Sequence, residues 1–218
     1  MLQQQLLRVV THHRDHPAVV DRHGKTRTYG DLLQDIEGLR ARLHAVGLRK
    51  GDVVVTQLGN SSSYVALLFA MASLELVHCP ISLACSTAHR AKRLKQVNAA
   101  VLVTEYGTMP AGTHVPSFAL RSQPPATLQP PAHQQQTGLM RMQEAPGNAG
   151  ATRLALWRQE HLHQEILHWV ECAGLDSSAR YLNIHSLDGH HATDLHVFPA
   201  LLTGATLYLG EAAHVEET

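Results

Sequence analysis

The sequence predicts an α/β fold in which parallel-sheet βαβ layers carry flanking helices. Short runs of β-branched and aliphatic residues, such as Val53–Thr56 and Ala100–Thr104, alternate with longer segments whose apolar residues recur at helical spacing. Strands and helices that alternate in this way favour parallel pairing through right-handed crossovers. With 218 residues, the chain can bury a core as one domain or as two small lobes.

Residues 1–106 are expected to form a first α/β lobe. A helix at Leu2–Val10 should precede a β-hairpin over Ala18–Tyr29. The next helix starts near Gly30, with Asp31 as the expected N-cap and Gly47 as the residue just past the C-cap. The remaining elements are expected as a strand at Val53–Thr56, a helix beginning within Asn60–Ser63, a strand at Val77–Ile81, a helix at Thr87–Val97 and a strand at Ala100–Thr104.

Residues 107–138 separate this lobe from a second α/β lobe at 139–218. Six prolines and the run Gln134–Gln136 predict a long irregular segment, with one short strand within His114–Leu120. In the second lobe the expected elements are a strand at Leu139–Gln143, an apolar run at Leu154–Trp157, a helix at Glu160–Ala173, a strand at Tyr181–Ile184, a helix at Thr193–Thr203 and a strand at Thr206–Leu209.

The composition argues against several classes of partner. Lys and Arg together number 18, as do Asp and Glu, so no net charge favours nucleic acid or an anionic membrane. No apolar run has the length of a transmembrane helix. Three cysteines and the absence of a signal peptide predict a reducing cytoplasm rather than a disulfide scaffold. We therefore expect a cytoplasmic protein that binds neither nucleic acid nor membrane.

A glycine-bearing loop, Ala145–Arg153, is the strongest candidate for a functional motif. Gly147 and Gly150 lie between the expected strand Leu139–Gln143 and the apolar run Leu154–Trp157. Glycine lets the chain turn without a Cβ clash, so backbone N–H groups of such a loop can approach a phosphate. The loop fits neither G-x-x-x-x-G-K-[ST] nor G-x-G-x-x-G, so its meaning depends on its place in the chain.

Three segments read as motifs in a fixed order. Thr28–Leu32 is similar to a Thr-Tyr-x-Glu-Leu motif, Gly47–Val54 to Gly-Val-x-x-Gly-Asp-x-Val, and Val197–Leu207 to the helix and strand that follow a Phe-Asp-x-Ser motif. This order resembles the adenylate-forming (AMP-binding) enzymes, which include CoA ligases and luciferases. The last segment is most similar to the adenylation domains of nonribosomal peptide synthetases. The resemblance implies the fold of the N-terminal half of that family's large domain.

The resemblance places the glycine loop on the family's phosphate loop, Thr-Ser-Gly-Ser/Thr-Thr-Gly-x-Pro-Lys-Gly. Gly147 and Gly150 match its glycines, while Asn148 and Arg153 replace a hydroxyl residue and the lysine. These four residues are the candidate phosphate-binding residues. The other hydroxyl positions hold Ala145, Pro146 and Ala149, so most of the side-chain donors are gone and Pro146 also lacks an N–H. The interpretation we favour is a degenerate loop, the remnant of an ATP site.

The resemblance also implies a substrate position. The Phe-Asp-x-Ser positions fall on His190–Thr193, which places His191 where amino-acid-activating members carry the aspartate that holds the substrate's ammonium group. A histidine cannot supply that negative charge. A metal site built from His185, His190, His191 and His196 is the alternative, but their spacing matches no known zinc motif, so no metal site is predicted. No catalytic residue is predicted either.

Three functional hypotheses follow. In the leading one the chain is a truncated, degenerate adenylation domain, a pseudoenzyme that is inactive alone, needs no cofactor and serves as a structural or docking element of a peptide-synthetase or polyketide assembly line. It ends at Thr218, before the family's adenine, magnesium and ribose motifs and its catalytic lysine. In the second it is half of a split or multidomain enzyme that uses ATP and Mg²⁺ to form an acyl-adenylate and then a carrier-protein thioester. In the third it is an interaction module whose exposed sheet edge is covered by another synthetase domain or subunit, or by self-association.

Overall fold

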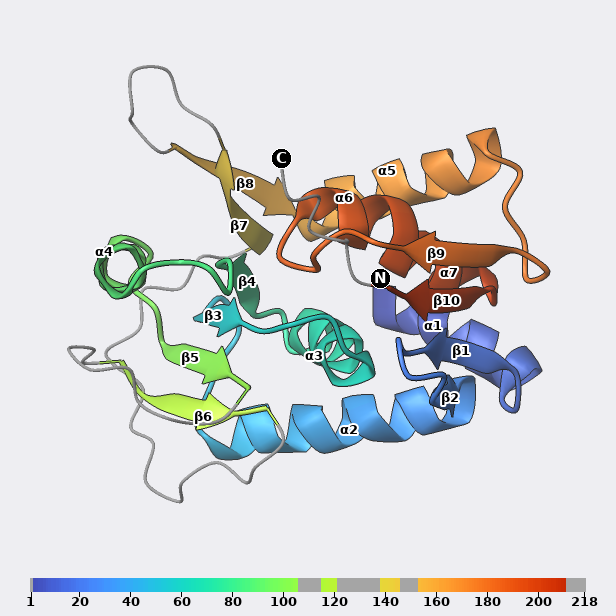
Figure 1. Cartoon of the computed structure of the whole chain (residues 1–218), viewed down its shortest axis with the longest axis horizontal. Coiled ribbons are helices and arrows are strands. Elements are labelled where there is room, and N and C mark those ends of the chain that lie inside the picture. The colour runs from blue at the N-terminus through green and yellow to red at the C-terminus, as the bar shows by residue number, and fades with distance from the viewer. Residues whose placement is uncertain (1, 106–114, 121–137, 146–152, 211–218) are drawn as a thin grey trace, which may run out of the picture.

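A computed structural model describes residues 2–105, 115–120, 138–145 and 153–210. Within these residues the strands form two sheets, and Figure 1 shows them side by side with helix α3 (Ser62–Ser73) between them. The sheets are mostly parallel and carry flanking helices, which confirms the predicted fold class. Two hairpins, each formed by adjacent strands of the chain, are the antiparallel exceptions.

The six-stranded sheet has the order β6-β5-β3-β4-β7-β8. Its strands are β3 (Val53–Gln57), β4 (Val77–Pro80), β5 (Val101–Thr104), β6 (Ser117–Ala119), β7 (Leu139–Ala145) and β8 (Arg153–Arg158). Every residue of β3 is buried, as expected for a central parallel strand covered on both faces. The short strand expected within His114–Leu120 is β6.

The four-stranded sheet has the order β2-β1-β10-β9 and joins distant parts of the chain. Its strands are β1 (Pro17–Val20), β2 (Thr26–Thr28), β9 (Arg180–Asn183) and β10 (Thr206–Leu209). β1 pairs with β10 in parallel, and the buried Tyr29 hydroxyl donates a 2.7 Å hydrogen bond to the carbonyl of Ala205. Each sheet thus contains strands from both sides of residues 107–138. The division into lobes at 1–106 and 139–218 stays a prediction.

Helices cover the sheets and fill the space between them. They are α1 (Leu2–His13), α2 (Tyr29–Ala45), α3, α4 (Thr87–Gln96), α5 (Gln159–Cys172), α6 (His190–Ala192), the π-helical turn η2 (Thr193–Val197) and α7 (Phe198–Thr203). Residues Tyr64–Ala72 of α3 are all buried, because this helix is apolar all round and lies in the core. No helix in the described part of the chain is both long enough and apolar enough to span a membrane.

Two sequence-based expectations about helices need correction. Asp31 is not the N-cap of α2: the cap is Thr28, whose hydroxyl accepts from the backbone N–H of Asp31, while the Asp31 carboxylate accepts from the backbone N–H of Thr28. This reciprocal capping box starts α2 earlier than expected. The last helical segment also starts earlier, at His190 instead of Thr193, and widens into the π turn. Gly47, with φ +82°, lies just past the C-cap as predicted.

Candidate functional site

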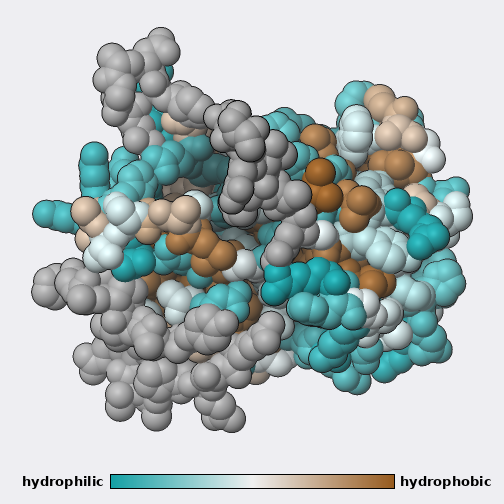
Figure 2. All heavy atoms as spheres, viewed as in Figure 1, coloured by the Kyte–Doolittle hydropathy of each residue, from teal (hydrophilic) through white to brown (hydrophobic). Residues whose placement is uncertain are grey.

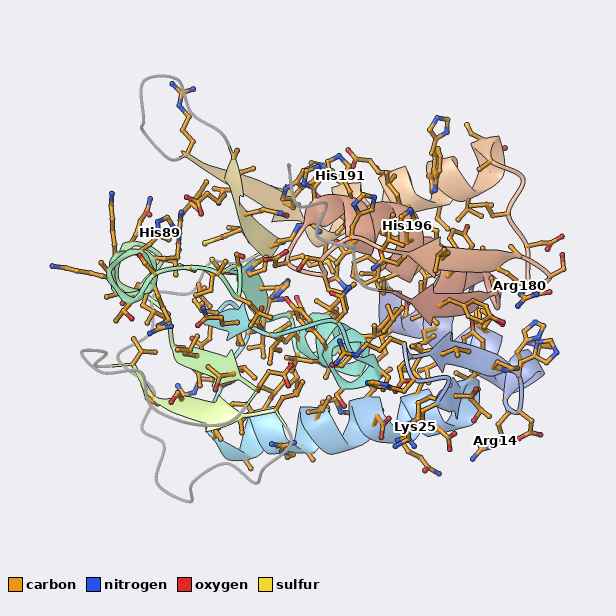
Figure 3. The ribbon with its side chains drawn as sticks, in the orientation of Figure 1. Arg14, Lys25, His89, Arg180, His191 and His196 are labelled. Atoms are coloured by element: carbon orange, nitrogen blue, oxygen red, sulfur yellow. The ribbon has the colours of Figure 1, made fainter. Side chains whose placement is uncertain are left out.

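The predicted site residues belong to two parts of the chain, the segment between β7 and β8 and the helix α6. Gly147, Asn148 and Gly150 lie outside the described residues, so the phosphate-loop assignment stays a prediction. Arg153 begins β8 and pairs with Ala145 at the end of the hairpin from which the loop leaves, and its side chain is exposed. His191 is an exposed residue of α6, and Figure 3 labels it on the same helical segment as His196.

Arg141 is the one charged residue buried within the hairpin's described strands, and it links β7 to the π turn. Its guanidinium donates to both carboxylate oxygens of Asp194, at 2.7 and 2.5 Å, and to the Thr193 hydroxyl at 2.9 Å. The guanidinium carbon lies 5.1 Å from the centre of the Trp157 ring on β8. With side-chain exposures of 4% and 14%, Arg141 and Asp194 form a buried, bidentate ion pair. A cation–π contact adds to it.

This ion pair determines whether the Asp194 carboxylate, next to α6, is available to a substrate. Asp194 follows His191 by three residues and lies on the adjoining helical turn. Both of its oxygens are bound by Arg141, and Oδ1 also accepts from the Thr193 hydroxyl at 2.9 Å. An ammonium group would have to displace a bidentate guanidinium to reach this carboxylate. Asp194 is therefore not available to bind a substrate ammonium group.

Histidine and tryptophan rings lie next to this ion pair. The rings of His190 and His191 have centroids 3.9 Å apart, and His190 stacks on Trp157 at 6.4 Å. Burial lowers the pKa of His190, and the neighbouring His191 and Arg141 lower it further. A neutral imidazole is therefore the favoured form of His190 near pH 7. The His190 ring therefore supplies stacking and hydrogen-bonding groups without a fixed charge.

A second pair of imidazoles joins this helical segment, through His196, to His185 in the connection after β9. His196 stacks on His185 at 5.7 Å, and its Nδ1 donates a 2.8 Å hydrogen bond to the side-chain oxygen of Asn183. Burial lowers the pKa of His196, with smaller contributions from His185 and His191. Among the residues that the structure describes, no group of three or more His, Cys, Asp or Glu side chains could hold a metal ion.

The interior near Arg141 leaves little space. A cavity of about 10 Å³ is lined by His78, Arg141, Thr193 and apolar residues that include Met140 and Phe198. This volume suits one water molecule and no substrate. Beside it, the His78 Nε2 lies 2.9 Å from the Thr56 hydroxyl and 3.2 Å from the Tyr64 hydroxyl, in a fully buried polar cluster.

Sequence reasoning missed the cluster of Arg141, Thr193, Asp194 and Trp157. A signal was present, because Arg141 stands between the apolar residues Met140 and Met142, and these three residues form the buried part of β7. A charged residue at such a position needs a buried partner. The identity of that partner depends on a tertiary contact over more than fifty residues, which no local pattern encodes.

Comparison with known proteins decides the family. The family model of the AMP-binding enzymes matches residues 6–217. The chain belongs to the AMP-binding enzyme family. This confirms the resemblance found in the motifs at Thr28–Leu32, Gly47–Val54 and Val197–Leu207. No curated protein sequence matches the chain.

Solved structures of AMP-binding enzymes share the fold. The N-terminal subdomain of Klebsiella oxytoca NpsA in complex with 3-hydroxybenzoyl-AMSN is 20% identical, with a TM-score of 0.81 over 97% of this chain and 54% of that one. O-succinylbenzoate coenzyme A synthetase (MenE) from Bacillus subtilis, in complex with AMP, is 16% identical, with a TM-score of 0.81 over 98% of this chain and 57% of that one. An artificially fused adenylation–PCP di-domain, NpsA-ThdA from Klebsiella oxytoca, is 19% identical with a TM-score of 0.82, over 97% of this chain and 43% of that one.

These matches place the chain on one part of a larger fold. It spans about half the length of the NpsA and MenE chains, while nearly all of its own residues are matched. The fold matches about half of the NpsA N-terminal subdomain. At these identities the similarity establishes architecture alone, so activity, substrates and partners are matters for proposal.

Proposed function

We propose that this chain is a degenerate adenylation domain that does not activate a carboxylate by itself, and that it serves as a structural or docking element of a nonribosomal peptide synthetase or polyketide assembly line. One observation behind the proposal, which bears on amino-acid substrates, is the state of the substrate position. His191 replaces the aspartate that amino-acid-activating relatives carry, and the Asp194 carboxylate is bound by Arg141. Nothing in this arrangement offers an anionic group to a substrate ammonium.

The sequence of the phosphate loop supports the same proposal. Hydroxyl side chains that would donate to ATP phosphates are replaced by Ala145, Pro146 and Ala149. Each charge-assisted hydrogen bond that is lost removes about 1.5–3 kcal/mol of binding free energy. Losing three or more of them exceeds what Asn148 and Arg153 could restore. The chain by itself is therefore proposed to need neither ATP nor Mg²⁺.

The assembly-line setting and the location rest on further observations. Structures with this fold include the NpsA-ThdA fusion of an adenylation domain with a PCP domain, and the nonribosomal peptide synthetase FmoA3, of whose chain the match covers 22%. A cytoplasmic location, with no nucleic acid or membrane partner, is supported by the balanced charge and by three cysteines that are all unpaired. The partner in this proposal is another synthetase domain or subunit.

Thermal unfolding with nucleotides tests the proposed inactivity. A ligand present at a hundred times its dissociation constant stabilises a protein by about 2.7 kcal/mol, which raises the Tm of a domain of this size by several degrees. We expect no such rise with ATP or AMP-PNP plus Mg²⁺. MenE from Bacillus subtilis, whose structure contains AMP, is the positive control with AMP. A shift of several degrees for this chain would overturn the proposal.

A second candidate function is favoured by the length of the match. Because the chain corresponds to little more than half of NpsA and MenE, it could act as one half of a split or multidomain enzyme that converts a carboxylate and ATP to acyl-AMP and then to a carrier-protein thioester. Asn148 and Arg153 would then contact phosphates and His191 would face the substrate. This function predicts carboxylate-dependent ATP–pyrophosphate exchange when the neighbouring gene product is added. The function would be rejected if exchange were absent with every carboxylate tested.

A further inference from the structure

Cys172 is the one exposed thiol among the three cysteines, and it forms a pair with His168 on helix α5. The two residues are four positions apart, so their side chains lie on one face of the helix. The Cys172 Sγ is 3.5 Å from the His168 Nε2 and 3.8 Å from its Nδ1. In Figure 1 this end of α5 lies at the edge of the molecule, and Figure 2 shows open surface of mixed hydropathy there.

The spacing of these two donor atoms fits a tetrahedral metal ion. A zinc ion binds thiolate sulfur at about 2.3 Å and imidazole nitrogen at about 2.0–2.1 Å, so at the tetrahedral angle the two ligand atoms lie about 3.6 Å apart. The observed distance between Sγ and Nε2 is 3.5 Å. Because the His168 ring is exposed, rotation about its Cβ–Cγ bond can direct a nitrogen lone pair at such an ion. The pair is therefore placed to form one edge of a zinc coordination tetrahedron.

The charge of α5 favours a cation at this end of the helix. The helix contains Glu160, Glu165 and Glu171 and has neither Lys nor Arg. Cys172 is its last residue, and the helix dipole is negative at a C-terminus. The acidic side chains and the dipole therefore both stabilise a divalent cation bound beside Cys172.

The other two cysteines are poorer ligands for an ion from solvent. Metal ions bind the thiolate form of cysteine. Burial raises the pKa of Cys79 to about 12, and it also raises the pKa of Cys85. Cys172 is exposed, so its proton can pass directly to water when a metal ion binds.

One chain supplies two of the four ligands that a closed zinc site needs. In the part of the chain that the structure describes, no group of three or more His, Cys, Asp or Glu side chains could hold a metal ion. We propose that His168 and Cys172 bind a soft divalent cation such as Zn²⁺, and that a second copy of this chain supplies the same pair. Two thiolates and two imidazoles then complete a tetrahedral site between two α5 helices that are related by a twofold axis. The site is independent of the proposed adenylation-like function.

Cobalt substitution tests the ligands. The probe is Co²⁺ alone, added without oxygen to the 218-residue chain after reduction with a phosphine. A thiolate bound to Co²⁺ gives a sulfur-to-metal charge-transfer band in the near ultraviolet, which histidine ligands alone do not give. We expect this band to saturate at one Co²⁺ per two chains, and Zn²⁺ to abolish it by displacing Co²⁺. Light scattering should show that Zn²⁺ doubles the molecular mass and that EDTA reverses the change.

Two variants and two controls assign the band to this pair. Cys172→Ser should abolish it. His168→Gln should weaken Co²⁺ binding at least about tenfold, because even outer-shell partners of a metal site contribute about 10–100-fold in affinity. Cys85→Ser and His161→Gln are the matched controls, the second at an exposed histidine of the same helix, and both should keep the band and the affinity. The Tm of each α5 variant is checked first and should match that of the wild type, because these positions are exposed.

Three results would overturn the proposal. They are the absence of the charge-transfer band, a band that persists in Cys172→Ser, and saturation at one ion per monomeric chain. Co²⁺ binding without the band would show that surface histidines alone hold the metal, and this too would reject the site.

Discussion

Arg141 on β7 donates two parallel hydrogen bonds to the carboxylate of Asp194 on the π turn, and this buried pair joins the hairpin that carries the glycine loop to the helix that carries His191. The two predicted sites are therefore mechanically connected. In this pair Arg141 occupies both oxygens of the Asp194 carboxylate, so the carboxylate is not free to bind a substrate cation. The Arg141–Asp194 contact therefore holds β7 against the π turn and also argues against recognition of an ammonium group by Asp194.

Removing Arg141 alone should be strongly destabilising. Arg141→Met leaves the Asp194 carboxylate largely buried without its partner, and breaking a buried pair in this way costs about 3–5 kcal/mol. The free energy of unfolding from urea denaturation measures the loss. Combining Arg141→Met with Asp194→Asn should cost clearly less than the sum of the two single changes, by about 1–3 kcal/mol. Strict additivity would show that the pair does not contribute as a unit.

His78 should make the fold sensitive to acid. Burial, assisted by the charge of Arg141, lowers the pKa of His78 from 6.5 to about 3. The folded state thus keeps this imidazole neutral, while the unfolded chain binds a proton below about pH 6.5. Stability present above that pH is lost as the pH falls towards 3, by up to about 1.4 kcal/mol per pH unit.

The variant His78→Gln isolates this contribution. Glutamine keeps a polar group near Thr56 and Tyr64 but does not titrate. We expect the plot of unfolding free energy against pH between 6.5 and 4 to be flatter than that of the wild type by about one bound proton. An unchanged slope would mean that His78 does not carry the acid sensitivity.

The capping box of α2 provides a local test. Thr28→Ala removes the hydroxyl that accepts from the Asp31 backbone, and loss of an N-cap costs about 0.5–2 kcal/mol. Thr26→Ala, at an exposed position of β2, is the matched control and should change stability by no more than about 0.5 kcal/mol. Chemical denaturation compares the two. Equal effects would argue against the cap.

Tyr29 tests the link between the two ends of the described chain. Its hydroxyl donates to the Ala205 carbonyl from a fully buried position, 176 residues away in sequence. Tyr29→Phe keeps the ring and leaves that carbonyl without this donor, which should cost about 1–3 kcal/mol. Thermal unfolding should show a lower Tm in a single transition. A Tm equal to that of the wild type would exclude a role for this bond in stability.

Local sequence patterns predicted most elements because the period of apolar residues is set by backbone geometry. The hairpin of β1 and β2, the fully buried β3 and the glycine past the C-cap of α2 follow from such patterns. The N-cap was assigned to the wrong residue because Thr28 and Asp31 are both good capping residues three positions apart. Only the backbone shows that they cap reciprocally.

Long-range contacts explain what the sequence left open. The pairing of β1 with β10 and the partnership of Arg141 with Asp194 join residues far apart in the chain, and hydrophobic periodicity carries no information about them. The π turn at Thr193–Val197 is likewise invisible to a helical pattern, because it differs from an α-helix by a single inserted residue. The candidate site thus depended on family motifs for its position and on the fold for its chemistry.

The measurement that tests the central claim most directly is isothermal titration of the isolated chain with ATP and Mg²⁺. The account predicts no saturable heat up to about 1 mM ATP. Any binding would then be weaker than about −4 kcal/mol, the free energy that corresponds to a dissociation constant of about 1 mM. A saturable isotherm with a micromolar dissociation constant would contradict it and would show that the chain still binds a nucleotide.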